Sequence, residues 1–95
     1  MSSDVMLRVM DAKAIGDPVR KLILLAIADC APPDGRGEAA TEHLQDFAEI
    51  DSDTLRKHLV FLRDEGVMIW MPHPEDDDAI VFQLRFDHPI WRRSK

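Results

Sequence analysis

Two basic side chains, Arg56 and Lys57, offer the clearest binding chemistry in this 95-residue chain. Guanidinium and ammonium groups bind phosphate oxygens, and arginine also makes paired hydrogen bonds to the edge of guanine. Such contacts require a rigid element that presents both cations to a partner. The alternative interpretation is that both are solvated charges, paired with Asp53 or Glu65 on the same helix. The choice between them depends on the elements that surround these residues.

The segment 41–65 is predicted to form two short helices joined by a tight turn, which is a helix-turn-helix. In the second helix Leu55, Leu59 and Leu62 recur at i, i+4 and i+7. This spacing gives the helix one apolar stripe that packs inward. Arg56 and Lys57 then belong to the outer face, where a partner can reach them.

Short polar residues mark the points where four helices begin. The expected caps are Asp4, Asp17, Thr41 and either Asp51 or Ser52. They precede an N-terminal helix over 4–14, an apolar core helix over 18–31, and the two helices of 41–65. Between them, the stretch 32–40 contains two prolines and two glycines, so we expect an exposed loop, with room for a short extended piece at 38–40.

Beyond Gly66 the apolar pattern changes from helical spacing to alternation, which predicts a β-hairpin over 67–87. Ile80, Phe82, Leu84 and Phe86 share one face of its second strand and are expected to pack on the helices. The loop 72–78 carries four acidic residues and forms the tip of the hairpin, the wing. The expected fold is mainly α with a small β-hairpin, an α+β winged helix-turn-helix, in a single domain over 1–95 with a basic tail at 88–95.

Four stretches follow one another in the chain: RKLILLAIADCA, PPDGRG, EHLQDFAEI and DTLRKHLVFLRDEGVM. In this order they resemble the winged helix-turn-helix domains of phage, plasmid and replication-associated bacterial proteins. The resemblance covers about half of the chain and implies a DNA-binding second helix. The chain departs from the family's pattern at four positions, where a small residue, a glycine and basic residues are usual: Gln45, Glu49, Ser52 and Asp53.

A DNA-binding interpretation places contacts on the second helix, the hairpin and the tail. Arg56 is the first candidate, because a recognition helix presents its N-terminal half to the bases of the major groove. In the tail, Arg92 and Arg93 either bind phosphates or remain solvated. Trp70 of the hairpin and Trp91 of the tail are expected to pack in a core or a dimer interface instead of stacking on bases. The candidate residues for binding double-stranded DNA are Ser52, Thr54, Arg56, Lys57, Arg85, Arg92 and Arg93.

A second interpretation is a protein interface, with Val60, Phe61, Met6 and Met10 as the candidate residues. Exposed apolar groups at Val60 and Phe61 suit a protein partner better than a DNA groove, although we expect Phe61 to pack as part of the core. Met6 and Met10 supply more apolar surface than a three-helix core needs, which favours a homodimer. The acidic wing would repel phosphates, or it simply keeps the hairpin tip soluble.

Composition restricts the remaining possibilities. The formal net charge is −6, so any contact with DNA must be local. The single cysteine, Cys30, excludes an intrachain disulfide, and we expect it to be a buried small side chain. The N-terminus has no cationic leader and the longest apolar run has seven residues, so we expect a cytoplasmic protein without a membrane span.

No catalytic, cofactor or metal site is expected. The four histidines fall at equal intervals of 15, but no two of them are three or four residues apart on one helix. No pair of nucleophile and base is evident, so an enzyme is not expected. Two hypotheses therefore stand: a dimeric DNA-binding regulator of transcription of bacterial, phage or plasmid origin, which we favour, and an acidic winged-helix module that binds another protein as an adaptor, inhibitor or nucleic-acid mimic.

Overall fold

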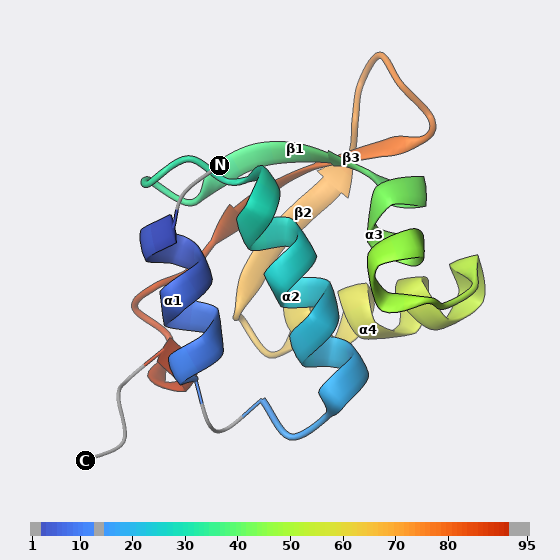
Figure 1. Cartoon of the computed structure of the whole chain (residues 1–95). Coiled ribbons are helices and arrows are strands. Elements are labelled where there is room, and N and C mark those ends of the chain that lie inside the picture. Colours follow the sequence, from blue (N-terminus) through green and yellow to red (C-terminus); the bar gives the residue numbers. More distant parts are fainter. Residues whose placement is uncertain (1–2, 13–14, 92–95) are drawn as a thin grey trace.

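The computed structural model of the chain describes residues 3–12 and 15–91. Four α-helices and a three-stranded antiparallel sheet follow the order α1-α2-β1-α3-α4-β2-β3, and a 3₁₀ turn closes the described part (Figure 1). The strand order in the sheet is β1-β3-β2. This is an α+β domain whose element order is compatible with a winged helix. The expected two-stranded hairpin was incomplete, because β1 adds a third strand from a distant part of the chain.

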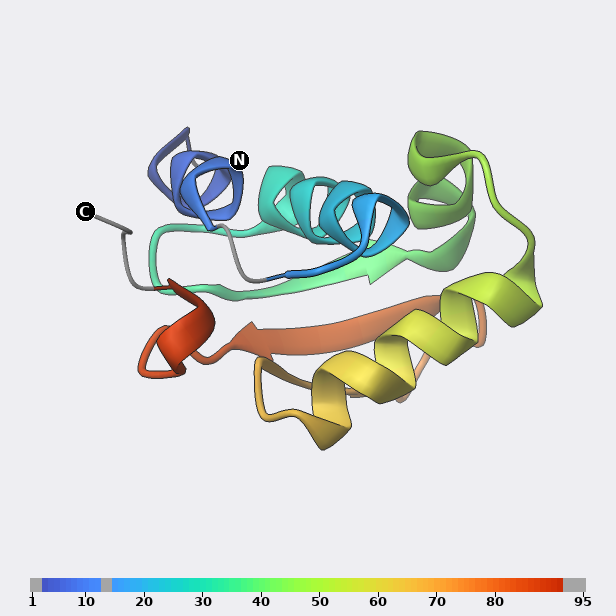
Figure 2. The same cartoon turned by 90° about the horizontal axis from the view of Figure 1, so that it is seen from below.

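Helices α1 and α2 lie side by side on one side of the sheet (Figure 2), and α4 packs along β2. Helix α1 runs from Ser3 to Asp11 and ends earlier than the predicted 4–14. At this end the Lys21 ammonium donates to the carbonyl oxygens of Met10 and Ala12 at 3.0 and 3.1 Å, which satisfies acceptors that have no partner inside the helix. Residues 13 and 14 of the prediction lie outside the described residues.

Helix α2, Pro18–Cys30, begins and ends close to the predicted positions. The Asp17 carboxylate accepts hydrogen bonds from the backbone amides of Val19 and Arg20 at 2.8 and 3.1 Å. These bonds satisfy two amides that have no partner inside the helix. Ile23, Leu24 and Ile27 are fully buried and form the centre of the core, as their spacing predicted.

Strand β1, Arg36–Ala40, contains the short extended piece expected at 38–40 and begins two residues earlier, within the predicted loop. It pairs with β3 from Arg36 opposite Gln83 to Ala40 opposite Ala79. A side chain at Gly37 would put its Cβ 3.0 Å from the carbonyl oxygen of Cys30, so glycine allows the strand to lie directly against the end of α2. A sequence rich in glycine predicts a loop, but here it permits close packing of a strand.

Helices α3, Thr41–Ala48, and α4, Ser52–Asp64, form the predicted helix-turn-helix. The prediction that Thr41 caps α3 was wrong. Its hydroxyl donates to the carbonyl oxygen of Asp78 at 3.0 Å and ties the helix to the start of β3. The cap position is Ala40, which makes no side-chain hydrogen bond. In the turn, Glu49 has a left-handed backbone with φ 55°.

Strands β2, Met68–Pro72, and β3, Ala79–Leu84, form the predicted hairpin. Ile80, Phe82 and Leu84 are buried on the inner face, which confirms the alternation. Residues 88–91 are not a solvated tail, because the 3₁₀ turn Pro89–Trp91 folds back onto the core. Trp91 is 7% exposed and meets the ring of Phe86 edge-on. Both tryptophans pack as expected, since the Trp70 indole donates to the carbonyl oxygen of Leu59 at 2.7 Å.

Candidate nucleic-acid interface

Helix α4 is held rigidly at its start and along one face. The Asp51 carboxylate accepts a hydrogen bond from the Thr54 amide at 2.8 Å and caps the helix. Leu55, Leu59 and Leu62 are at most 3% exposed, so the predicted apolar stripe faces the core. The opposite face is open to solvent, and its orientation is fixed by this packing.

Arg56 and Lys57 lie on this open face and are both exposed. Together with Asp53 and Val60 they surround a shallow hollow of about 490 Å³. Within residues 3–12 and 15–91, no acidic group lies within ion-pair distance of either cation. The alternative interpretation, an ion pair with Asp53 or Glu65, is therefore not realised in the described residues. The Lys57 charge is close enough to Asp51 to contribute to lowering the pKa of that carboxyl.

Most other cations in the described part of the chain already have partners inside the molecule. The guanidinium groups of Arg8, Arg20 and Arg63 lie over the rings of Phe86, Phe61 and Trp70 at 4.5, 3.6 and 4.6 Å from the ring centres. Lys21 is held by two carbonyl oxygens. Arg36 on β1, like Arg56 and Lys57, makes no ion pair with the described residues, but it lies on another surface. Arginines stacked on aromatic rings contribute to packing, so they are poorly placed to reach a phosphate.

The remaining residues of the predicted DNA-binding set have mixed positions. Ser52 is exposed at the start of α4, while Thr54 is half-buried. The Thr54 hydroxyl and amide both bond to the Asp51 carboxylate, and these hydrogen bonds lower the pKa of Asp51. Arg85 is paired with Asp87 at 3.4 Å, which also lowers the pKa of that carboxyl. Arg92 and Arg93 lie outside the described residues.

One acidic residue of the wing borders the surface of α4. Asp77 lines a hollow of about 230 Å³ together with Ser52 and Arg56, while the tip of the loop projects beyond the end of the sheet, away from α4 (Figure 1). The loop is a turned structure in which the Asp78 amide donates to the carboxylate of Asp76 at 2.9 Å. Glu75, Asp76, Asp77 and Asp78 are all exposed. One wing carboxylate therefore shares a hollow with Arg56.

The predicted apolar patch on α4 is divided between two surfaces. Val60 is half-buried beside Arg56 and Lys57, whereas Phe61 borders a separate hollow with Ile15 and Ile90. Phe61 is 40% exposed, so the expectation that it packs as core was wrong. It lies at the rim of the α2–α4 contact, where the Arg20 guanidinium covers its ring.

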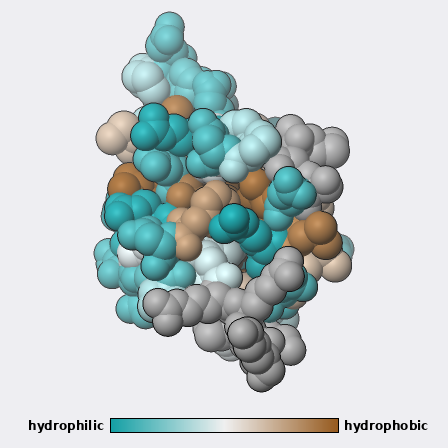
Figure 3. All heavy atoms as spheres, turned by 90° about the vertical axis from the view of Figure 1, so that its left-hand side faces the viewer, coloured by the Kyte–Doolittle hydropathy of each residue, from teal (hydrophilic) through white to brown (hydrophobic). Residues whose placement is uncertain are grey.

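The two methionines of the predicted dimer surface also differ. Met6 packs against the core, and Met10 is 57% exposed. Leu7 on the same helix is also exposed. On the side of the molecule where α1 lies, hydrophobic side chains alternate with hydrophilic ones (Figure 3).

His58 is the one histidine of α4, and its charge responds to the packing of α4 on α2. Partial burial lowers the pKa of His58, and the nearby Asp17 carboxylate opposes this shift. The pKa of Asp17 is itself lowered, chiefly by the hydrogen bond from the Arg20 amide. A neutral His58 therefore suits the folded helix pair near neutral pH.

Within the described ranges, no three residues of metal-binding type are grouped closely enough to hold an ion. Burial raises the pKa of the Cys30 thiol, which makes it a poor nucleophile at neutral pH.

No helix in the described part of the chain is long and apolar enough to span a bilayer. No family model, curated protein or solved structure matches the chain.

Two features of this surface had no clear signal in the sequence. The arginine–aromatic contacts join residues far apart in the chain, so spacing alone does not reveal which cations remain available. Asp77 and Arg56 line one hollow although they come from the hairpin and from α4. The pairing of β2 with β3 brings the end of this loop to the hollow, which spacing alone does not reveal.

Proposed function

We propose that this chain is a winged-helix DNA-binding domain that places the N-terminal half of α4 in the major groove of double-stranded DNA, as a regulator of transcription. The observation that supports it is the exposed pair Arg56 and Lys57, neither held by a carboxylate, on the second helix of a helix-turn-helix. Most other cations of the described residues are engaged in internal contacts.

In this proposal Arg56 makes a contact with guanine or phosphate, and Lys57 binds a neighbouring phosphate. Ser52 lies at the exposed start of α4, where a hydroxyl can donate to a phosphate oxygen. Thr54 supports the site through the Asp51 cap, which fixes the start of the helix. Arg92 and Arg93 remain predicted phosphate contacts.

A second candidate function is binding of a protein partner through an acidic surface. The observation in its favour is that Asp77 of the wing lines the same hollow as Arg56. The segment from Thr41 to Asp64 carries six acidic and three basic residues, and the wing adds four further acids. A basic protein that normally binds nucleic acid would recognise such a surface by charge complementarity.

Fluorescence anisotropy distinguishes the two candidates. The purified chain is titrated against a duplex from its own upstream region and against a scrambled duplex, at low and at physiological salt. The DNA proposal expects salt-sensitive binding that prefers the native duplex, and binding that is equal or tighter after Asp76→Asn with Asp77→Asn, because repulsion of phosphates is reduced.

Absence of binding to both duplexes, even at low salt, would contradict the DNA proposal and favour the protein partner. If the wing variant binds DNA more weakly, the assumption that these acids only oppose phosphate contact is wrong. Circular dichroism of the variant checks that the hairpin change leaves the helices intact.

A further inference from the structure

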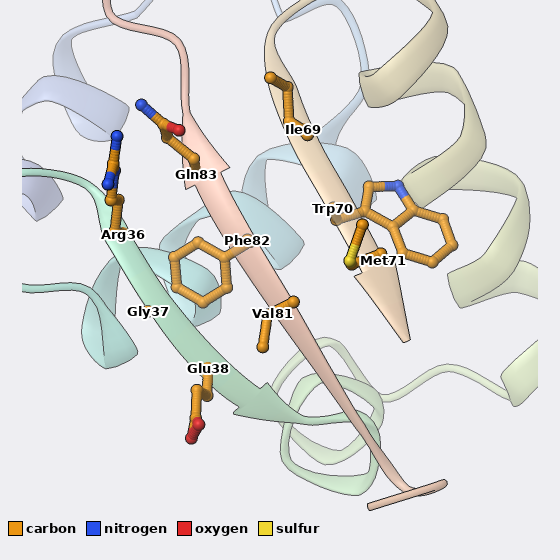
Figure 4. Close-up of a pocket in the computed structure, with 9 residues that line it drawn as sticks. All are labelled: Arg36, Gly37, Glu38, Ile69, Trp70, Met71, Val81, Phe82 and Gln83. Carbon is orange, nitrogen blue, oxygen red and sulfur yellow. The ribbon is translucent and has the colours of Figure 1, made fainter. Parts of the chain in front are cut away.

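The outer face of the sheet carries no helix among the described residues. Six side chains project from it: Arg36 and Glu38 on β1, Val81 and Gln83 on β3, and Ile69 and Met71 on β2 (Figure 4). They surround a shallow hollow of about 530 Å³. Ile69 and Met71 are 47% and 57% exposed, although both lie in the middle of a strand.

The register of the strands arranges these six side chains in two rows. The first row is Arg36, Gln83 and Ile69, and the second is Glu38, Val81 and Met71. Each row begins with a charge on β1 and ends with an apolar side chain on β2, and the two charges have opposite sign. Between the rows lies a third set of paired residues, Gly37, Phe82 and Trp70.

We propose that a second copy of this chain packs on this face, related by a two-fold axis that lies outside the sheet, midway between the two copies, and runs across the strands parallel to the line of Gly37, Phe82 and Trp70. Such an axis exchanges the two rows, so Arg36 meets the partner's Glu38, and Ile69 meets the partner's Met71. Each contact occurs twice in a symmetric dimer. Two sheets that pack face to face lie about 10 Å apart, a distance that side chains of this length fill.

In the single chain, both charges on this face can still bind a group from another molecule. Within the described residues the Arg36 guanidinium makes no ion pair. The Glu38 carboxylate bonds through Oε2 to the Nε2 of His73 at 3.0 Å, and its other oxygen is open to a second donor. A guanidinium donates to a carboxylate in a fixed planar geometry, so this reciprocal pair also sets the register of the two copies.

The pattern is self-complementary in a way that a contact with an unrelated partner does not require. One row begins with a positive charge and the other with a negative charge, and both rows end with an apolar side chain. Opposite charges of two copies therefore meet only when the first row of one copy lies on the second row of the other. The proposal does not depend on DNA binding, because none of the six residues lies on α4. It differs from the dimer predicted through Met6 and Met10, which lie on α1.

Sedimentation equilibrium of the full chain tests the charges. Arg36→Glu alone places a second carboxylate opposite the partner's Glu38, and Glu38→Arg alone places two guanidinium groups together; either repulsion occurs twice in the dimer. We expect each single variant to raise the dimer dissociation constant at least about tenfold, because like charges oppose each other across the interface. An equimolar mixture of the two variants restores both ion pairs, and we expect its heterodimer within about threefold of the wild-type constant.

A second pair of variants tests the apolar end of the rows. Met71 and Met10 are both 57% exposed, so Met10→Ser is a matched control for Met71→Ser. We expect Met71→Ser to raise the dissociation constant at least about tenfold and Met10→Ser to leave it unchanged. A wild-type chain that is monomeric at millimolar concentration, a mixture no tighter than its components, or dissociation by Met10→Ser but not by Met71→Ser would each overturn the proposal.

Discussion

The salt dependence of DNA binding gives the most direct test of the role of Arg56 and Lys57. We consider the variant Arg56→Gln with Lys57→Gln, which removes both cations from the open face of α4. Each phosphate that a cation neutralises contributes about 0.9 to the slope of log affinity against log salt. Loss of two such contacts should therefore reduce the magnitude of the slope by about 1.8 per domain.

This difference is large enough to measure. Between 50 and 200 mM salt, a slope difference of about 1.8 means that wild-type affinity falls about 12-fold more than that of the variant. Contacts made by Arg92 and Arg93 affect both proteins equally and cancel in the comparison. Anisotropy titrations of one duplex at four or five salt concentrations give both slopes.

A matched control removes two cations that are engaged inside the molecule. Arg8→Gln with Arg63→Gln changes the net charge by the same amount, but these guanidinium groups lie over the rings of Phe86 and Trp70. The control should keep the wild-type slope. If it loses as much slope as the α4 variant, the effect comes from overall charge, and the assignment of α4 to the groove is wrong. An unchanged slope in the α4 variant refutes the assignment equally.

Three further predictions concern stability. Leu62 is fully buried, so Leu62→Ala should lower the free energy of unfolding by about 2–5 kcal/mol in urea titrations, whereas Leu22→Ala, at a side chain 38% exposed, should cost far less; equal losses would contradict the placement of α4. Glu49 has φ 55°, a conformation that favours glycine, so Glu49→Gly should raise the free energy of unfolding by about 0.5–1 kcal/mol, and a loss would mean that the side chain makes a compensating contact. The pKa of His58 is lowered from 6.5, so the unfolded chain binds the proton more readily and stability should decrease as the pH falls below 6.5. His58→Gln should reduce this loss in melts between pH 7.5 and 5.5, above the range where Asp17 and Asp51 titrate, and an identical pH profile would argue against burial as the cause.

Local spacing was sufficient to predict the helices and the hairpin. The i, i+4, i+7 leucines of α4 and the alternation from Ile80 to Leu84 place these residues in the core, because each period matches its element. The expected cap Asp17 and one of the two expected at the fourth helix, Asp51, are confirmed, whereas Asp4 lies inside the first turn of α1, which begins at Ser3. The failures are at positions where a distant partner decides. Thr41 bonds to Asp78 instead of capping α3, and β1 becomes a strand because β3 supplies its hydrogen bonds.

The candidate site was predicted in part. Arg56 and Lys57 were identified from the helical face, and the structure describes both as exposed. The structure was needed to show that Arg85 is paired with Asp87 and that Phe61 lies at the surface beneath Arg20. The amino-acid sequence does not reveal these contacts. The outer face of the sheet was absent from the sequence interpretation, since its two rows combine strands that are far apart in the chain.

The sequence by itself determined which residues are apolar and how they are spaced, and through that spacing the type of each helix and the hairpin. These properties depend on contacts between neighbours a few residues apart, which a linear pattern records. Only the tertiary structure decided which cations remain available, where the acidic wing lies, and which charges meet across the sheet. These properties depend on the pairing of distant segments, because a charge is neutralised by whatever group packing brings within a few ångströms of it.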